Sequence, residues 1–237
     1  VTGNPATLYE LDAWYPLPSG SNAARVYLEA FASFRDPEVT FELLPIVGGG
    51  KLGDPSEPMA PEVLEASKIY LAANQKALEL LREAATIEEC RYPIDLTLGL
   101  EVSLPNLAQV RGAARLLTLE AIVQAEEGHG DEAAESIGLI FPLARSLENE
   151  PILISQLVRC AMLHMAEGGL ERVLNRTQVN DEQLQALDKA VGHALEIPAF
   201  VRAFAGERCM YLDAMDRYGP FSIPGGPMKW GKVTDIA

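Results

Sequence analysis

The chain has 237 residues, of which 48% are hydrophobic and 22% are charged, and its net charge is −15. This length and composition predict a globular chain with a sizeable core, while the acidity argues against nucleic acid as a partner. No run approaches the roughly 18 apolar residues of a membrane span, and three cysteines without a Cys-x-x-Cys pair exclude a disulfide-dense scaffold.

The N-terminal part predicts two short helices, over residues 6–14 and 23–35. Asn22 is suited to cap the second helix, and Asp36-Pro37 is suited to end it. Because the sequence begins at Val1 and not at Met, we expect that an N-terminal piece has been removed. That expectation leaves the compartment open between the cytoplasm and export after loss of an N-terminal signal.

Residues 37–60 predict a long irregular segment that interrupts the helices. Residues 39–47 are compatible with a short strand outside the centre of a sheet, since Pro45 cannot donate a ladder hydrogen bond. Gly48 to Gly53 matches G-x-G-x-x-G, but Asp54-Pro55 follows where a dinucleotide site needs a helix. The stretch also lacks the Ser or Thr that a P-loop places after Lys51. We therefore predict a loop and no cofactor.

The rest of the chain predicts six further helices. Their expected ranges are 61–84, 106–127, 131–147 with a kink at Pro142, 150–174, 180–195 and 198–217. The helix over 150–174 is apolar nearly all round, which places it at the centre. Gly168-Gly169 is a point where that helix could bend or break. Together these patterns predict an all-α fold of about seven helices, stacked as antiparallel hairpins with the irregular insertion near 37–60.

The domain boundaries follow from composition. Residues 1–218 are expected to form a single helical domain, and residues 219–237 are a Pro/Gly-rich tail. The tail ends without a clear stop signal, which leaves open whether the natural chain continues beyond Ala237.

Small residues recur around the turn that Gly128 to Asp131 predicts. Ala121, Gly128 and Ala133 are followed by the large apolar Ile137, and this spacing over residues 113–147 resembles a tetratricopeptide-type helical hairpin. The resemblance implies an α-α superhelix that binds a protein or a peptide on a concave face.

One helix face carries residue types that can bind a metal. Cys160, His164, Glu167 and Glu171 follow one another at three- and four-residue steps. This face is the best metal-ligand constellation in the chain, although a histidine on a largely apolar helix is also typical of a hydrogen-bonded core residue. A catalytic Ser-His-Asp or Cys-His arrangement cannot be identified.

Charged residues on apolar helix faces predict a buried ion pair. Arg159 lies in the central apolar helix, and Glu120 and Glu207 share faces with apolar neighbours. A buried charge is tolerated when it is paired, so we expect Arg159 to pair with Glu120 or Glu207. Arg115 and Arg208 are the alternative cations.

Two functions therefore remain open. The first is a non-enzymatic scaffold or interaction module that binds a protein or peptide in a groove between helices. The second is a metal-binding bundle or enzyme that uses Cys160, His164 and Glu167, with Glu207. Inward-pointing polar side chains without a partner would favour the second, and an apolar groove would favour the first.

Overall fold

A computed structural model describes residues 3–36, 41–195 and 199–219. The fold is all-α, with 68% helix and no strand among those residues, which confirms the predicted class. Residues 41–47, where a short strand was expected to end, form turns and one isolated bridge between Pro45 and Gly50. The elements are α1 (Leu8–Trp14), α2 (Ala23–Ala32), α3 (Pro61–Ala73), α4 (Gln75–Ala85), the 3-10 helix η2 (Leu96–Glu101), α5 (Pro105–Glu126), α6 (Gly130–Gly138), α7 (Ile140–Arg145), α8 (Leu153–Arg176), α9 (Asp181–Leu195) and α10 (Ala199–Tyr218).

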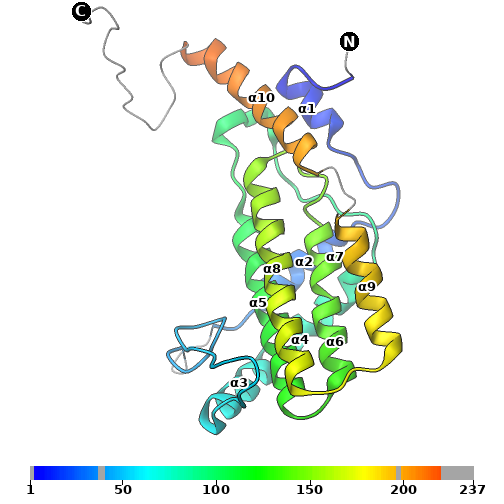
Figure 1. Cartoon of the computed structure of the whole chain (residues 1–237). Coiled ribbons are helices and arrows are strands. Elements are labelled where there is room, and N and C mark those ends of the chain that lie inside the picture. Colours follow the sequence, from blue (N-terminus) through cyan, green and yellow to red (C-terminus); the bar gives the residue numbers. More distant parts are fainter. Residues whose placement is uncertain (1–2, 37–40, 196–198, 220–237) are drawn as a thin grey trace, which may run out of the picture.

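The centre of the molecule is α5, which packs most extensively against α8 and α6 and also contacts α2, α3, α4 and α7 (Figure 1). Its long apolar run is buried on several sides, as in Leu117, Leu119 and Ile122. The prediction that the helix over 150–174 lies at the centre is therefore wrong. The sequence of α8 is apolar nearly all round, which is typical of a central helix, but the helix that other elements enclose is its neighbour α5.

The helix α8 instead has mixed polarity: it buries Met162 and Val173 beside polar and small residues, and it leaves several apolar side chains exposed. Gln156 and Arg159 are buried on its inner face, while Ile154, Leu157 and Leu174 are 48%, 49% and 48% exposed. Gly168-Gly169 does not break it, and α8 is continuous. A Cβ on Gly169 would press against Ile137 of α6 and Thr118 of α5, so that glycine permits close packing.

A helical hairpin joins α5 to α6 at the predicted turn. Gly128 adopts the left-handed conformation, with φ +83°, and the amide of His129 donates to the carbonyl oxygen of Gln124 at 2.9 Å. Ala121 and Ala133 are fully buried, as close packing of the two helices requires. The hairpin is present, whereas stacking of the tetratricopeptide type stays a prediction.

Two expected helices are each divided by a polar or proline residue. The helix over 61–84 is split at Asn74, whose buried side chain accepts from the amide of Arg35 at 2.9 Å and donates to Tyr70 at 3.0 Å. The predicted kink at Pro142 is confirmed, because α6 ends at Gly138 and α7 begins at Ile140.

The two ends of the molecule are closed by different elements. At one end α1 packs against η2 and α10, and at the other lie α3 and residues 41–60, which we call the 41–60 loop (Figure 1). None of the described helices combines the length and the apolar character that crossing a membrane requires. The predicted tail lies outside the described residues beyond Gly219, and the domain boundaries stay a prediction.

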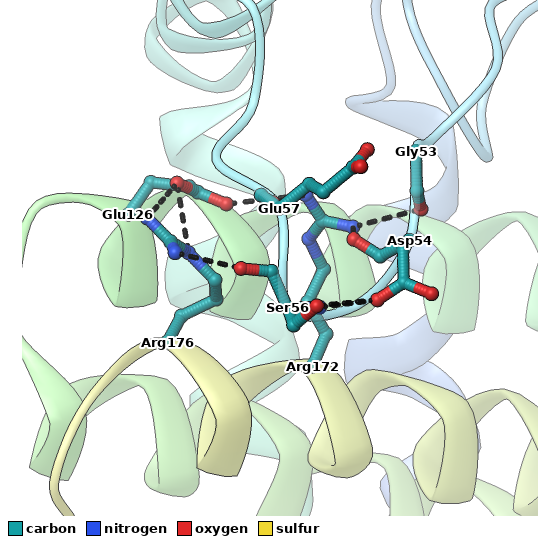
Figure 2. Close-up of polar contacts among 7 residues, drawn as sticks. All are labelled: Gly53, Asp54, Ser56, Glu57, Glu126, Arg172 and Arg176. Carbon is teal, nitrogen blue, oxygen red and sulfur yellow. Dashed lines mark hydrogen bonds and ion pairs between the residues drawn. The ribbon is translucent and has the colours of Figure 1, made fainter.

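The 41–60 loop is tied to α8 by a buried ion-pair cluster (Figure 2). Arg172 donates to the carbonyl oxygens of Gly53, Asp54 and Glu57 at 3.2, 3.2 and 2.9 Å, and it pairs with Glu126 at 3.2 Å. The last residue of the G-x-G-x-x-G stretch, Gly53, is therefore held by Arg172, and no helix begins directly after it. Cβ atoms on its first and third glycines would overlap backbone within the loop itself. These glycines are explained by the loop's own turns.

Candidate binding groove between α8 and α9

A groove of about 610 Å³ lies between α8 and α9, above the start of α7. It forms because α9 packs on α6 and α7, while α8 lies across from it without extensive contact. We call it the α8–α9 groove. Its lining residues are Phe141, Cys160, Leu163, His164, Ala166, Glu167, Leu170, Glu171, Leu174, Val191 and Ala194.

The lining of the α8–α9 groove is mainly apolar. Leu163 and Leu170 are half-buried, and Leu174 and Val191 at its opposite sides are 48% and 38% exposed. Leaving such side chains in water forgoes about 25 cal/mol for each Å² of apolar surface. A ligand that covers this apolar groove would therefore gain binding free energy from the burial of its surface.

The predicted metal ligands lie on one side of this groove. His164 Nδ1 and Glu167 Oε2 are 3.2 Å apart, and their side chains are 83% and 79% exposed. Cys160 is exposed one turn earlier. The structure thus brings His164 and Glu167 together, but nowhere among the described residues does it assemble three His, Cys, Asp or Glu side chains that could hold a metal.

A second cavity, of about 350 Å³, adjoins the groove and shares Phe141, Leu163 and Ala194 with it. We call it the cationic cavity because four basic side chains and one carboxylate line it. These residues are Arg145 of α7, Arg159 of α8, Lys189 and His193 of α9, and Glu88.

The predicted pairing of Arg159 is wrong. Arg159 is buried, at 5% exposure, but its Nη2 donates to the carbonyl oxygen of Ala194 at 2.8 Å. Glu120 pairs instead with Arg82 at 2.7 Å and accepts from Ser136 at 3.1 Å, because its side of α5 faces α4 and α6. Helical periodicity shows which side of a helix is apolar, but it does not show which neighbour covers that side.

Glu207 also has a different role from the predicted one. Its Oε1 accepts the amide of Leu153 at 2.8 Å, at the N-terminus of α8, where helix amides otherwise lack partners. Of the alternative cations, Arg208 donates to the carbonyl oxygen of Pro5 at 2.6 Å. Arg115 forms no ion pair within the described part of the chain.

Burial dominates the electrostatics next to the cationic cavity. Desolvation lowers the pKa of Arg159, and the charge of Glu148 partly offsets that effect. Desolvation raises the pKa of Glu148, against the opposing charges of Arg145, Arg159, His193 and Arg202. The carboxylate of Glu148 is within electrostatic reach of Arg159 but is not in ion-pair contact with it.

The sequence predicted only one of the cationic residues, Arg159. Lys189 and His193 lie four residues apart on α9, and Arg145 is in the last turn of α7. The four-residue spacing is visible in the sequence. That α7, α8 and α9 bring these residues to one cavity depends on tertiary packing, which no local pattern encodes.

No family model, curated protein or solved structure matches the chain.

Proposed function

We propose that this protein is a non-enzymatic interaction module that binds an apolar segment of a partner protein in the α8–α9 groove. The observation that carries the proposal is the apolar surface that α8 leaves exposed beside the groove. Its buried face holds Gln156, Arg159 and Arg172 together with Met162 and Val173, while apolar side chains such as Leu174 point outward. Unpartnered apolar surface of this kind is typical of sites that bind an amphipathic helix.

The charges around the groove favour an occupant of defined polarity. Glu167 and Glu171 follow one side of it, and the cationic cavity adjoins it. We expect a partner helix with apolar residues at three- and four-residue steps, basic residues facing the acidic side, and an acidic group toward the cationic cavity. Such complementarity fixes orientation more than it adds affinity.

The likeness to tetratricopeptide hairpins agrees with this function but does not carry it. It is supported by the buried alanines and the left-handed glycine of the α5–α6 hairpin. We propose that the hairpin is the scaffold on which α8 and α9 form the groove. The second function, a metal-binding bundle or enzyme, gains no specific support, because only His164 and Glu167 come together.

The proposal can be tested with a displayed library of random helical peptides. We expect the selected peptides to carry apolar residues on one helical face and to bind the purified protein. A Leu174→Lys substitution places a charge in the groove, so it should weaken their binding at least about tenfold, because losing an anchor residue costs about 2 kcal/mol or more and tenfold corresponds to about 1.4 kcal/mol.

The matched control is Ile69→Lys on α3, since Ile69 is 59% exposed and lies outside the groove. That variant should bind the peptides as the wild type does. Equal binding to the wild type and to Leu174→Lys, measured by fluorescence anisotropy, would place the site elsewhere and contradict the proposal.

A further inference from the structure

The cationic cavity stands out against the charge of the whole chain. The protein carries 34 Asp and Glu against 19 Lys and Arg, yet this one cavity gathers two arginines and a lysine, with a histidine, against a single exposed carboxylate, Glu88. Lys189 and His193 are exposed and Arg145 is half-buried, so these charges alone would be of little consequence. What sets the cavity apart is that three helices bring them around the buried Arg159, at a volume of about 350 Å³.

The most telling member of the cavity is Arg159, because it is buried without a counter-ion in contact. It is 5% exposed, it makes one hydrogen bond to a neutral carbonyl oxygen, and its Nε has no hydrogen-bond partner. No carboxylate within the described ranges pairs with it. A buried guanidinium in this state is costly, and an anion that enters the cavity removes part of that cost.

We propose that the cationic cavity is a binding site for a carboxylate attached to an apolar body. The carboxylate accepts hydrogen bonds from Arg159, with Arg145 and Lys189 supplying further positive charge. The apolar body lies over the residues that the cavity shares with the α8–α9 groove, namely Phe141, Leu163 and Ala194. This inference does not rest on the proposed function, because a small organic acid would use the same cavity without any partner protein.

A carboxylate fits better than a phosphate for two reasons. First, Glu88 lines the cavity and Glu148 acts on Arg159 from close by, so the net positive charge suits a singly charged anion. Second, the cavity adjoins an apolar groove, and a phosphate dianion would pay a larger desolvation cost there. A carboxylate has two planar oxygens that match the geometry of a guanidinium group.

Octanoate is a suitable probe, because it combines a carboxylate with an apolar chain, and octanamide is its neutral counterpart. We expect calorimetric titration to show octanoate bound and octanamide bound at least about tenfold more weakly. Arg159→Met keeps the apolar stem and removes the charge, so it should weaken octanoate binding by a similar factor. Arg25→Met, at an exposed arginine outside the cavity, should leave it unchanged.

A second variant keeps the test decisive if Arg159→Met does not fold. Lys189 is exposed and lines the same cavity, so Lys189→Met should fold and should weaken octanoate several-fold. Equal binding of octanoate and octanamide, or unchanged octanoate binding in both variants, would overturn the carboxylate site.

A second pair of probes distinguishes a carboxylate of the partner segment from that of a free organic acid. An apolar peptide selected for the groove is compared with the same peptide bearing a neutral amide in place of its carboxylates. If the peptide loses affinity with the amide and competes with octanoate, the carboxylate belongs to the partner segment. If octanoate binds and no peptide does, the cavity takes a free organic acid, and the carboxylate site stands although the proposed function fails.

Discussion

At the scale of single residues, the least expected group is Glu150, which is fully buried and forms no ion pair with any of the described residues. Asn106 donates to its Oε1 at 3.2 Å, and its Oε2 has no hydrogen-bond partner. Burial raises the pKa of Glu150 to about 7, and the nearby side chains of Ser155 and Asn106 only partly oppose this effect. The folded protein therefore binds a proton here that the unfolded chain releases at lower pH.

This carboxyl group predicts a fall in stability as pH rises. Its pKa increases from the ordinary value of 4.5 to about 7 on folding, so between these values the folded state binds more protons. The free energy of unfolding therefore falls as pH rises through that window, by a total on the order of 3 kcal/mol. Urea unfolding at about pH 4 and about pH 8 measures most of this loss.

The control is Glu150→Gln, which keeps the shape and removes the titration. That variant should show a smaller loss of stability than the wild type over the same pH interval. If both proteins have the same pH dependence, the shifted proton is not held by Glu150.

Two neighbouring glutamates at the end of α5 should differ sharply in their importance. Glu126 is 4% exposed and pairs with the buried Arg172, whereas Glu127 forms a surface pair with Lys68. Glu126→Gln removes the counter-charge of a buried arginine and should cost about 3–5 kcal/mol. Glu127→Gln should cost less than about 1 kcal/mol.

Urea unfolding of both variants measures this difference. Because Arg172 also binds the 41–60 loop, limited proteolysis should cut that loop faster in Glu126→Gln than in Glu127→Gln. Similar stability losses in the two variants would contradict the buried pair, and similar cleavage rates would show that the cluster in Figure 2 does not hold the loop.

At the scale of helices, close approach decides which glycines are replaceable. A Cβ on Gly206 of α10 would overlap the carbonyl oxygen of Pro151, whereas a Cβ on Gly168 of α8 would meet open space. Gly206→Ala should therefore destabilise the protein by roughly 1–3 kcal/mol. Gly168→Ala should stabilise it by roughly 0.5–1 kcal/mol, because alanine has the higher helix propensity. Thermal unfolding of the two variants checks both signs, and a stable Gly206→Ala would mean that α10 does not cross so closely.

The sequence was informative about elements and much less so about their neighbours. The cap at Asn22, the turn at Gly128 and the kink at Pro142 were predictable because each acts on backbone within a few residues. The position of α8 was not predictable, because an apolar helix looks the same whether its apolar residues meet the core or the groove. Asn74 was missed for a related reason, since its partner Arg35 is far away in sequence.

The same limit applies to the candidate site. The face from Cys160 to Glu171 was found by helical spacing, and it does lie along the groove. Its meaning changed once α9 was placed opposite, because the facing residues are apolar, such as Val191, and not further metal ligands. The cationic cavity forms only when three helices pack together. The spacing of Lys189 and His193 is the one part of it that the sequence shows.

At the scale of the whole molecule, the central claim is that one face, between α8 and α9, binds a partner. A competing surface exists on α10, where Val201 and Phe204 are 66% and 61% exposed. That surface has exposed apolar side chains, but neither residue lines the groove or the cationic cavity described above. Affinity measurements alone do not separate the two surfaces, whereas a method that maps the bound face does.

The most direct test is hydrogen–deuterium exchange with and without a peptide selected by display. We predict slower exchange in α7, in α8 from about Cys160 to Leu174, and in α9, with α10 and α3 unchanged. Protection confined to α10, or no protection along α8 and α9 at saturating peptide, would contradict the account.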